Sequence, residues 1–197
     1  MRKLSLTVLM SLGLLGCAVE RVEPLNVPLV YAPTSSATVL TGVLSCATIG
    51  PIEVTDARPD KSLGLRTMET KPLKAAVSTG SDPTAWVRQG VDSYLSHNGI
   101  KVQGSGPTLG LTLNQLLTTE SVYHRASYTA VVSLTGELKS PSGKSCWKGT
   151  FEGKAGNYGY AGSIENYQET LNGALDAASV LLTSTQTFRD ALCHCGD

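Results

Sequence analysis

The chain has 197 residues, and its 16 basic and 16 acidic side chains give it a formal charge of zero. A dedicated nucleic-acid-binding protein needs a basic surplus to replace counterions, so this balance argues against one. Hydrophobic residues make up 41% of the chain and charged residues 16%, which is typical of a folded domain rather than a disordered segment. The length suffices for one domain with one core.

The first seventeen residues have the features of a lipoprotein leader. Two basic residues precede a mostly apolar stretch over residues 4–15, which is too short to span a bilayer but has the length of a secretory signal. The Leu-Leu-Gly-Cys sequence at residues 14–17 resembles the lipobox of bacterial lipoproteins. The resemblance implies a signal peptide over residues 1–16, acylation of Cys17 and, from Ala18, sorting to the periplasmic face of the outer membrane. An ordinary secreted protein whose leader contains a cysteine is the alternative.

Residues 17–37 are predicted to form a lipidated, flexible tether. Three prolines and a pair of serines disfavour regular structure there, while Leu29, Val30 and Tyr31 suit docking on the domain. Removal of the two basic leader residues leaves 14 basic and 16 acidic side chains. The mature chain therefore has no basic surplus to attract anionic lipid, and the acyl chains must provide the membrane attachment.

A single α+β periplasmic domain, ending in a tail that contains cysteines, is predicted over residues 38–197. Its strands are expected where apolar and polar residues alternate. These stretches are residues 39–46, 52–56, 100–102, 109–114, 128–138 and 147–154, with a short strand near residues 63–66 inside a long loop over residues 59–81.

Two helices are predicted between and after these strands. The first begins at Asp82-Pro83, which suits an N-cap and a first helical residue, and it ends at Asn98-Gly99. The second begins near Ser163 and carries one apolar stripe, with a break at Ser184-Thr185 before it continues. The order of elements predicts an α+β fold, a mostly antiparallel sheet with two helices packed on one face, preceded by the lipidated tether.

Several short motifs resemble the YajG-like bacterial lipoproteins, a family without an established activity. Besides the lipobox, they are Val-Thr-Asp-Ala-Arg at residues 54–58, Gly-Leu-Arg at residues 64–66, the helix end at residues 98–99 and Leu-Asn-Gly-Ala-Leu at residues 171–175. The resemblance covers residues 38–183. It implies an envelope lipoprotein with an α+β domain, and it transfers no catalytic residue.

The cysteines that remain after lipidation are Cys46, Cys146, Cys193 and Cys195. The periplasm permits disulfides, and four cysteines allow three connectivities. Either Cys193 and Cys195 are each linked to the body of the domain, or Cys46 is linked to Cys146. A metal site is the competing interpretation, because a Cys-His-Cys sequence can ligate zinc or copper, with a further ligand from Cys46, Cys146, His97 or His124. No spacing identifies that ligand, so we predict no metal and no cofactor.

Two groups of residues are candidates for binding. Asp56 and Arg58 share one face of a strand, where Arg66 is expected to join them. They form either a local ion pair or a polar anchor in a groove beside the loop over residues 59–81. Tyr158 and Tyr160 lie in a glycine-containing loop and serve either a binding surface or the cover of the core.

The sequence contains no recognisable catalytic motif, so we expect a protein that is not an enzyme. The principal hypothesis is a lipid-anchored accessory module that binds an envelope protein. A carrier or sensor of a small envelope ligand (a lipid, a glycan fragment or a peptide) is the alternative, and a metal or redox function of the terminal cysteines is the third. The sequence does not determine the partner or the oligomeric state.

Overall fold

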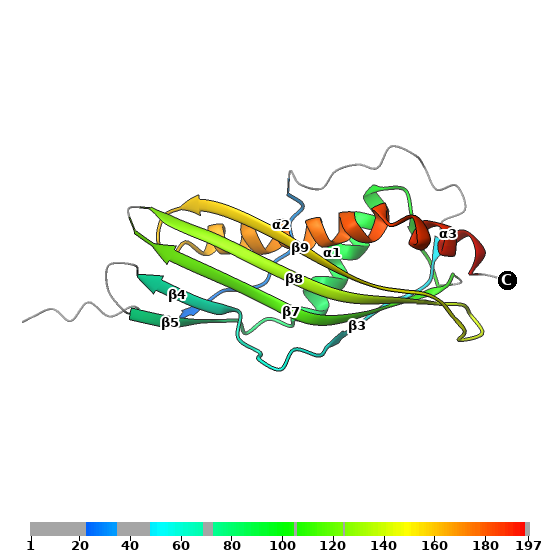
Figure 1. Cartoon of the computed structure of the whole chain (residues 1–197), viewed down its shortest axis with the longest axis horizontal. Coiled ribbons are helices and arrows are strands. Elements are labelled where there is room, and N and C mark those ends of the chain that lie inside the picture. The colour runs from blue at the N-terminus through cyan, green and yellow to red at the C-terminus, as the bar shows by residue number, and fades with distance from the viewer. Residues whose placement is uncertain (1–22, 35–47, 69–72, 105, 124, 196–197) are drawn as a thin grey trace, which may run out of the picture.

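The sheet is built around three long antiparallel strands. In the computed structural model, which describes residues 23–34, 48–68, 73–104, 106–123 and 125–195, they are β7 (Thr108–Val122), β8 (Ala126–Lys139) and β9 (Ser145–Gly159). Each strand pairs with the next. Every second side chain of β8, from Ala126 to Leu138, is buried, because alternate residues of a strand point to opposite faces. One face of the sheet therefore packs against the core, and the other is open (Figure 1).

Shorter strands extend the sheet beyond β7. β3 (Ile52–Asp56) and β4 (Gly64–Met68) both run parallel to β7, one after the other along the same edge. β5 (Leu73–Ser78) pairs with β4, and β1 (Leu25–Asn26) pairs with β5, which gives the order β1-β5-β4-β7-β8-β9 among the described strands. β2 (Thr48–Ile49) and β6 (Lys101–Val102) form a separate small sheet.

The prediction of a long loop over residues 59–81 is wrong over β5, whereas the short strand expected near residues 63–66 is confirmed as β4. Ala75 and Val77 of β5 face the core, while the alternating residues Lys74, Ala76 and Ser78 are exposed. Two neighbouring alanines make this alternation of hydrophobicity weak in the sequence, so pairing with β4 determines the strand more than local composition does. The strand predicted at residues 39–46 lies outside the described residues.

The helices cover one face of the sheet (Figure 1). They are α1 (Pro83–His97), α2 (Ile164–Ser184) and α3 (Gln186–His194). Asp82 accepts a hydrogen bond from the Thr84 backbone nitrogen at 2.8 Å, and Ser163 accepts one from that of Asn166 at 3.2 Å, so both long helices have side-chain N-caps. Thr185 is extended and separates α2 from α3 at the predicted break. No helix within the described ranges is long and apolar enough to cross a membrane. The predicted α+β fold class is confirmed.

The helix α2 lies close to the strand β9. Leu171 and Leu175 of its predicted stripe are buried, and Gly153 of β9 faces the helix. A Cβ atom at Gly153 would lie 2.0 Å from the carbonyl oxygen of Ala174, so only glycine permits this approach.

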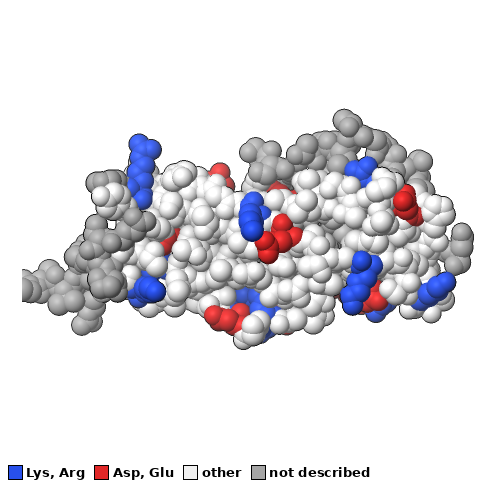
Figure 2. Space-filling view, in the orientation of Figure 1, with Lys and Arg blue, Asp and Glu red and all other residues white. Residues whose placement is uncertain are grey.

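Figure 2 shows the opposite, open face of the sheet, which is mostly uncharged and carries a few neighbouring basic and acidic groups.

Residues 23–34, which belong to the predicted tether, lie packed on the domain. Val27 is fully buried, and Tyr31 donates a hydrogen bond to the buried Asp176 carboxylate at 2.7 Å. Burial, followed by the nearby Asp176, raises the pKa of Tyr31. Of the three residues predicted to dock, Leu29 and Tyr31 pack against the core, whereas Val30 is exposed. Residues 18–22 are therefore the part of the predicted tether between Cys17 and the packed segment.

Candidate functional site

The edge of the sheet has a gap between β3 and β4. β3 pairs with residues 109–113 of β7 and β4 pairs with residues 118–122, so residues 114–117 have no strand partner on this side within the described parts of the chain. The connection between β3 and β4, residues 57–63, loops away from β7 (Figure 1). Two backbone hydrogen bonds close the ends of the gap. The Ala57 nitrogen donates to the Leu113 carbonyl oxygen at 3.0 Å, and the Thr118 nitrogen donates to the Leu63 carbonyl oxygen at 2.6 Å.

An open cavity of about 360 Å³ lies between this connection and β7. We call it the edge notch. Its lining comes from the connection and from two strands: Arg58, Pro59, Asp60, Ser62, Asn114, Gln115, Leu116, Leu117 and Ser133. Polar groups and the apolar walls of Pro59, Leu116 and Leu117 therefore occur side by side, as in sites that bind a peptide or a small molecule.

A β-bulge gives the edge notch its floor. The register between β7 and β8 shifts between Leu113 and Gln115. Leu113 and Leu116 are buried, whereas Asn114 is half-buried and Gln115 is exposed, so two consecutive side chains turn away from the core. Asn114 is held by a hydrogen bond from its side-chain amide to the Thr135 hydroxyl at 2.9 Å.

Asp56 and Arg58 form an ion pair beside the edge notch. The Arg58 guanidinium donates Nε to Asp56 Oδ1 at 3.0 Å, Nη2 to Oδ2 at 2.9 Å and Nη1 to the Ser62 carbonyl oxygen at 3.1 Å. Arg58 is only 4% exposed. Hydrogen bonds from Arg58 lower the pKa of Asp56 to about 2, with a smaller contribution from Lys61. The pair therefore lies at a groove beside the loop, and its role in binding stays a prediction.

Arg66 does not join this pair, so that expectation is wrong. Its Nε donates to Oε2 of the fully buried Glu120 at 2.5 Å. The same carboxylate accepts the Tyr167 hydroxyl at 2.8 Å, the Tyr128 hydroxyl at 3.1 Å and the Gly162 backbone nitrogen at 2.6 Å. Burial and the carboxylate raise the pKa of both tyrosines. Arg66 thus belongs to a buried network at the start of α2.

Sequence reasoning missed Glu120 as the centre of this network. The predicted strand ends at residue 114, whereas β7 continues to Val122. The alternation along β7 places Glu120 on its buried face, because Leu116, Thr118 and Glu120 all face the core and the residues between them are more exposed. A carboxylate at such a position must be paired or hydrogen-bonded, which makes it a candidate for a structural or functional network.

Tyr158 and Tyr160 point into solvent. Their exposed fractions are 73% and 88%, so they do not cover the core. Their role in a binding surface remains a prediction. The Tyr160 backbone carbonyl accepts a hydrogen bond from the Tyr128 hydroxyl, which attaches this loop to the buried network. Tyr123, in the turn between β7 and β8, is also 59% exposed, and no pattern in the sequence marks it as a binding candidate.

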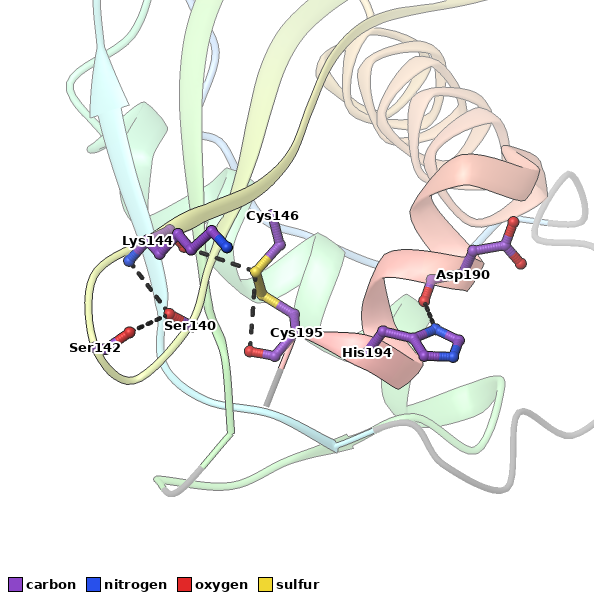
Figure 3. The surroundings of a disulfide bond; sticks show 7 residues. All are labelled: Ser140, Ser142, Lys144, Cys146, Asp190, His194 and Cys195. Carbon is purple, nitrogen blue, oxygen red and sulfur yellow. Dashed lines mark hydrogen bonds between the residues drawn. A yellow bond between two sulfur atoms is a disulfide. The ribbon is translucent and has the colours of Figure 1, made fainter. Parts of the chain in front are cut away.

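The C-terminal cysteines are oxidised. Cys146 at the start of β9 forms a disulfide with Cys195 just after α3, beside the turn between β8 and β9 (Figure 3). The alternative bond between Cys146 and Cys46 is therefore wrong. Cys193 is also disulfide-bonded. Cys17, Cys46 and His124 lie outside the described residues.

The residues proposed for a metal site do not present thiolates. Cys193 and Cys195 are both in disulfides, and the ring of His194 contacts the Asp190 carbonyl oxygen at 2.7 Å through Nδ1. Among the described residues, no group of three or more histidine, cysteine, aspartate or glutamate side chains comes together in a way that could hold a metal ion.

Comparisons with known proteins give only distant structural neighbours. No family model matches the chain, and no curated protein matches it. The protein XCC0632 from Xanthomonas campestris, described by the family model DUF330, has 11% identity and a TM-score of 0.49, with 85% of this chain and 95% of that chain covered. An uncharacterised protein has 15% identity and a TM-score of 0.46, with 82% and 96% covered. This likeness assigns neither a family nor an activity to the chain.

Proposed function

We propose that this protein is a lipid-anchored envelope module of the YajG-like type that binds a protein partner at the edge notch and has no catalytic role. The leader and Cys17 support export and acylation. The disulfide between Cys146 and Cys195 supports the same placement, because disulfides persist in the periplasm. By the sorting residue Ala18, the anchor lies in the outer membrane and the domain faces the periplasm.

The edge notch is the single observation that carries the binding role. Unpaired strand edges accept extended segments of partner proteins through backbone hydrogen bonds, and residues 114–117 form such an edge. Leu117 lines the notch and is exposed on the open face of the sheet. An extended partner segment could therefore pair with β7 and place an apolar side chain against Leu117, with Arg58 as a fixed polar wall.

Site-specific photocrosslinking in intact cells tests this proposal. A photoreactive amino acid replaces Gln115, an exposed residue of the edge notch, in the full-length acylated protein. Thr150, exposed on β9, provides the matched control position. We expect one envelope protein to be captured from position 115 and not from position 150. Equal capture from both positions, or none from position 115, would contradict a partner at the notch.

A small envelope ligand is the second candidate occupant. The volume of about 360 Å³ lies near the lower limit of small-molecule pockets, which supports this alternative. Native mass spectrometry of the protein released gently from membranes distinguishes the two. A bound mass in the absence of any crosslinked protein favours the ligand, whereas a captured protein and no bound mass favour the accessory module.

A further inference from the structure

Three strongly exposed tyrosines lie at one end of the sheet. Tyr123 belongs to the turn between β7 and β8, and Tyr158 and Tyr160 lie at the end of β9 and just after it. The strand register brings them to the same end, because Ser127 of β8 pairs with both Ser121 and Tyr158. We call this group the tyrosine end. The turn between β8 and β9 forms the opposite end of these strands (Figure 1).

The chain enters the domain at the same end. The carbonyl oxygen of Glu23, the first described residue, accepts a hydrogen bond from Arg66 Nη1 at 3.2 Å. Arg66 is paired with Glu120, which accepts the Tyr128 hydroxyl, and that hydroxyl also contacts the Tyr160 carbonyl oxygen. Glu23 and Tyr160 are therefore connected through one compact network. Because the following residues pack on the domain, this entry point is fixed relative to the sheet.

Six residue steps separate Glu23 from Cys17. A fully extended chain spans at most about 3.6 Å per residue, so the entry point lies within about 22 Å of the acylated cysteine. Acyl chains on Cys17 thus hold the tyrosine end, rather than the opposite end, near the lipid headgroups.

We infer that the tyrosine end rests on the membrane interface that holds the acyl chains; this inference rests on the lipid anchor of the proposed function. Tyrosine suits an interface because its ring is apolar and its hydroxyl is polar. Among the described residues at this end, the exposed basic residues are Lys74 and Arg125, and the exposed acidic residues are Glu23, Glu165 and Glu169. These described residues give no basic surplus, so the rings rather than net charge provide the attraction.

This orientation determines how far the edge notch lies from the membrane. Gln115 lies eight residues before Tyr123 along β7 and its turn. At about 3.3 Å per strand residue, the notch is held about 25 Å from the tyrosine end. A partner would therefore bind at the edge notch on the periplasmic side, away from the lipid headgroups.

Fluorescence quenching by brominated lipids tests the orientation. Tyr160→Trp and Tyr158→Trp place a reporter at the tyrosine end, and Ser142→Trp places one in the turn at the opposite end. The native Trp86 and Trp147 are common to all variants. The full-length acylated proteins are reconstituted in phosphatidylcholine vesicles with and without brominated chains. We expect loss of emission on brominated vesicles for Tyr160→Trp and Tyr158→Trp, beyond that of Ser142→Trp.

Two outcomes separate the orientation from the anchor itself. Equal emission changes for all three variants, in protein that floats with the vesicles, would overturn the orientation and leave the lipid anchor standing. Protein that carries no acyl mass and fails to float would overturn the anchor and the orientation with it. A larger loss for Ser142→Trp than for Tyr160→Trp would place the opposite end on the membrane.

Discussion

Replacing Asp56 with asparagine removes the charge that faces the buried Arg58 and keeps the shape of the side chain. The pKa of Asp56 is lowered from 3.8 to about 2, and each pKa unit is worth about 1.4 kcal/mol, so the carboxylate contributes at most about 2.5 kcal/mol. The Asp56 side chain is 16% exposed and solvent screens part of this interaction, which leaves about 1–2 kcal/mol. We expect Asp56→Asn to lower the free energy of unfolding by that amount near neutral pH.

The dependence on pH identifies the ion pair as the cause. Since the folded pKa lies below the unfolded one, the contribution is present above about pH 4 and is lost as the pH falls toward about 2. Urea unfolding followed by tryptophan fluorescence, with the disulfides intact, measures the wild-type protein, Asp56→Asn and the control Asp60→Asn. The gap between wild type and Asp56→Asn should narrow on acidification, and Asp60→Asn should show a smaller effect. A gap that stays constant over the same range would refute the reasoning.

Two further substitutions test the buried network of Glu120 and the packing of α2 on β9. Glu120→Gln leaves Arg66 facing a neutral amide in a buried network, so we expect a loss of about 3 kcal/mol in the same urea assay; stability equal to wild type would mean that the carboxylate is not required. Gly153→Ala adds a Cβ atom 2.0 Å from the Ala174 carbonyl oxygen, so α2 must move, and we expect a loss of about 2 kcal/mol or more; an unchanged midpoint would show that the helix yields freely.

The features that the sequence predicts well are those determined by neighbouring residues. The N-caps of α1 and α2 follow from Asp82 and Ser163, and the break between α2 and α3 follows from Thr185. The pair of Asp56 and Arg58 is equally local, because the two residues are two apart in the chain, although Arg58 lies just beyond the end of β3 and not on the strand. These features can therefore be predicted without knowing how the strands pair in the sheet.

The features that the sequence fails to predict depend on pairing between distant strands. Arg66 and Glu120 are 54 residues apart and meet because β4 runs parallel to β7. The bulge near Asn114 shifts the alternation of β7, so the second half of that strand no longer continues the pattern of its first half. The edge notch follows from both causes, since it needs the gap between two edge strands and the bulge opposite it. No run of neighbouring residues encodes such a site.

The segment over residues 23–34 shows how composition can predict too much flexibility. Prolines limit regular hydrogen bonding, which in this segment is confined to the short strand β1, but the rest of the segment can still be held by side chains of the domain. Gln168 donates to the Pro28 carbonyl oxygen at 2.9 Å, and Asn172 donates to that of Val30 at 3.1 Å. These bonds replace the strand partners that the prolines preclude. Because the segment is fixed in this way, the residues between Cys17 and Glu23 are too few to hold the domain far from the lipid, and the proposed contact of the tyrosine end follows from the length of the chain.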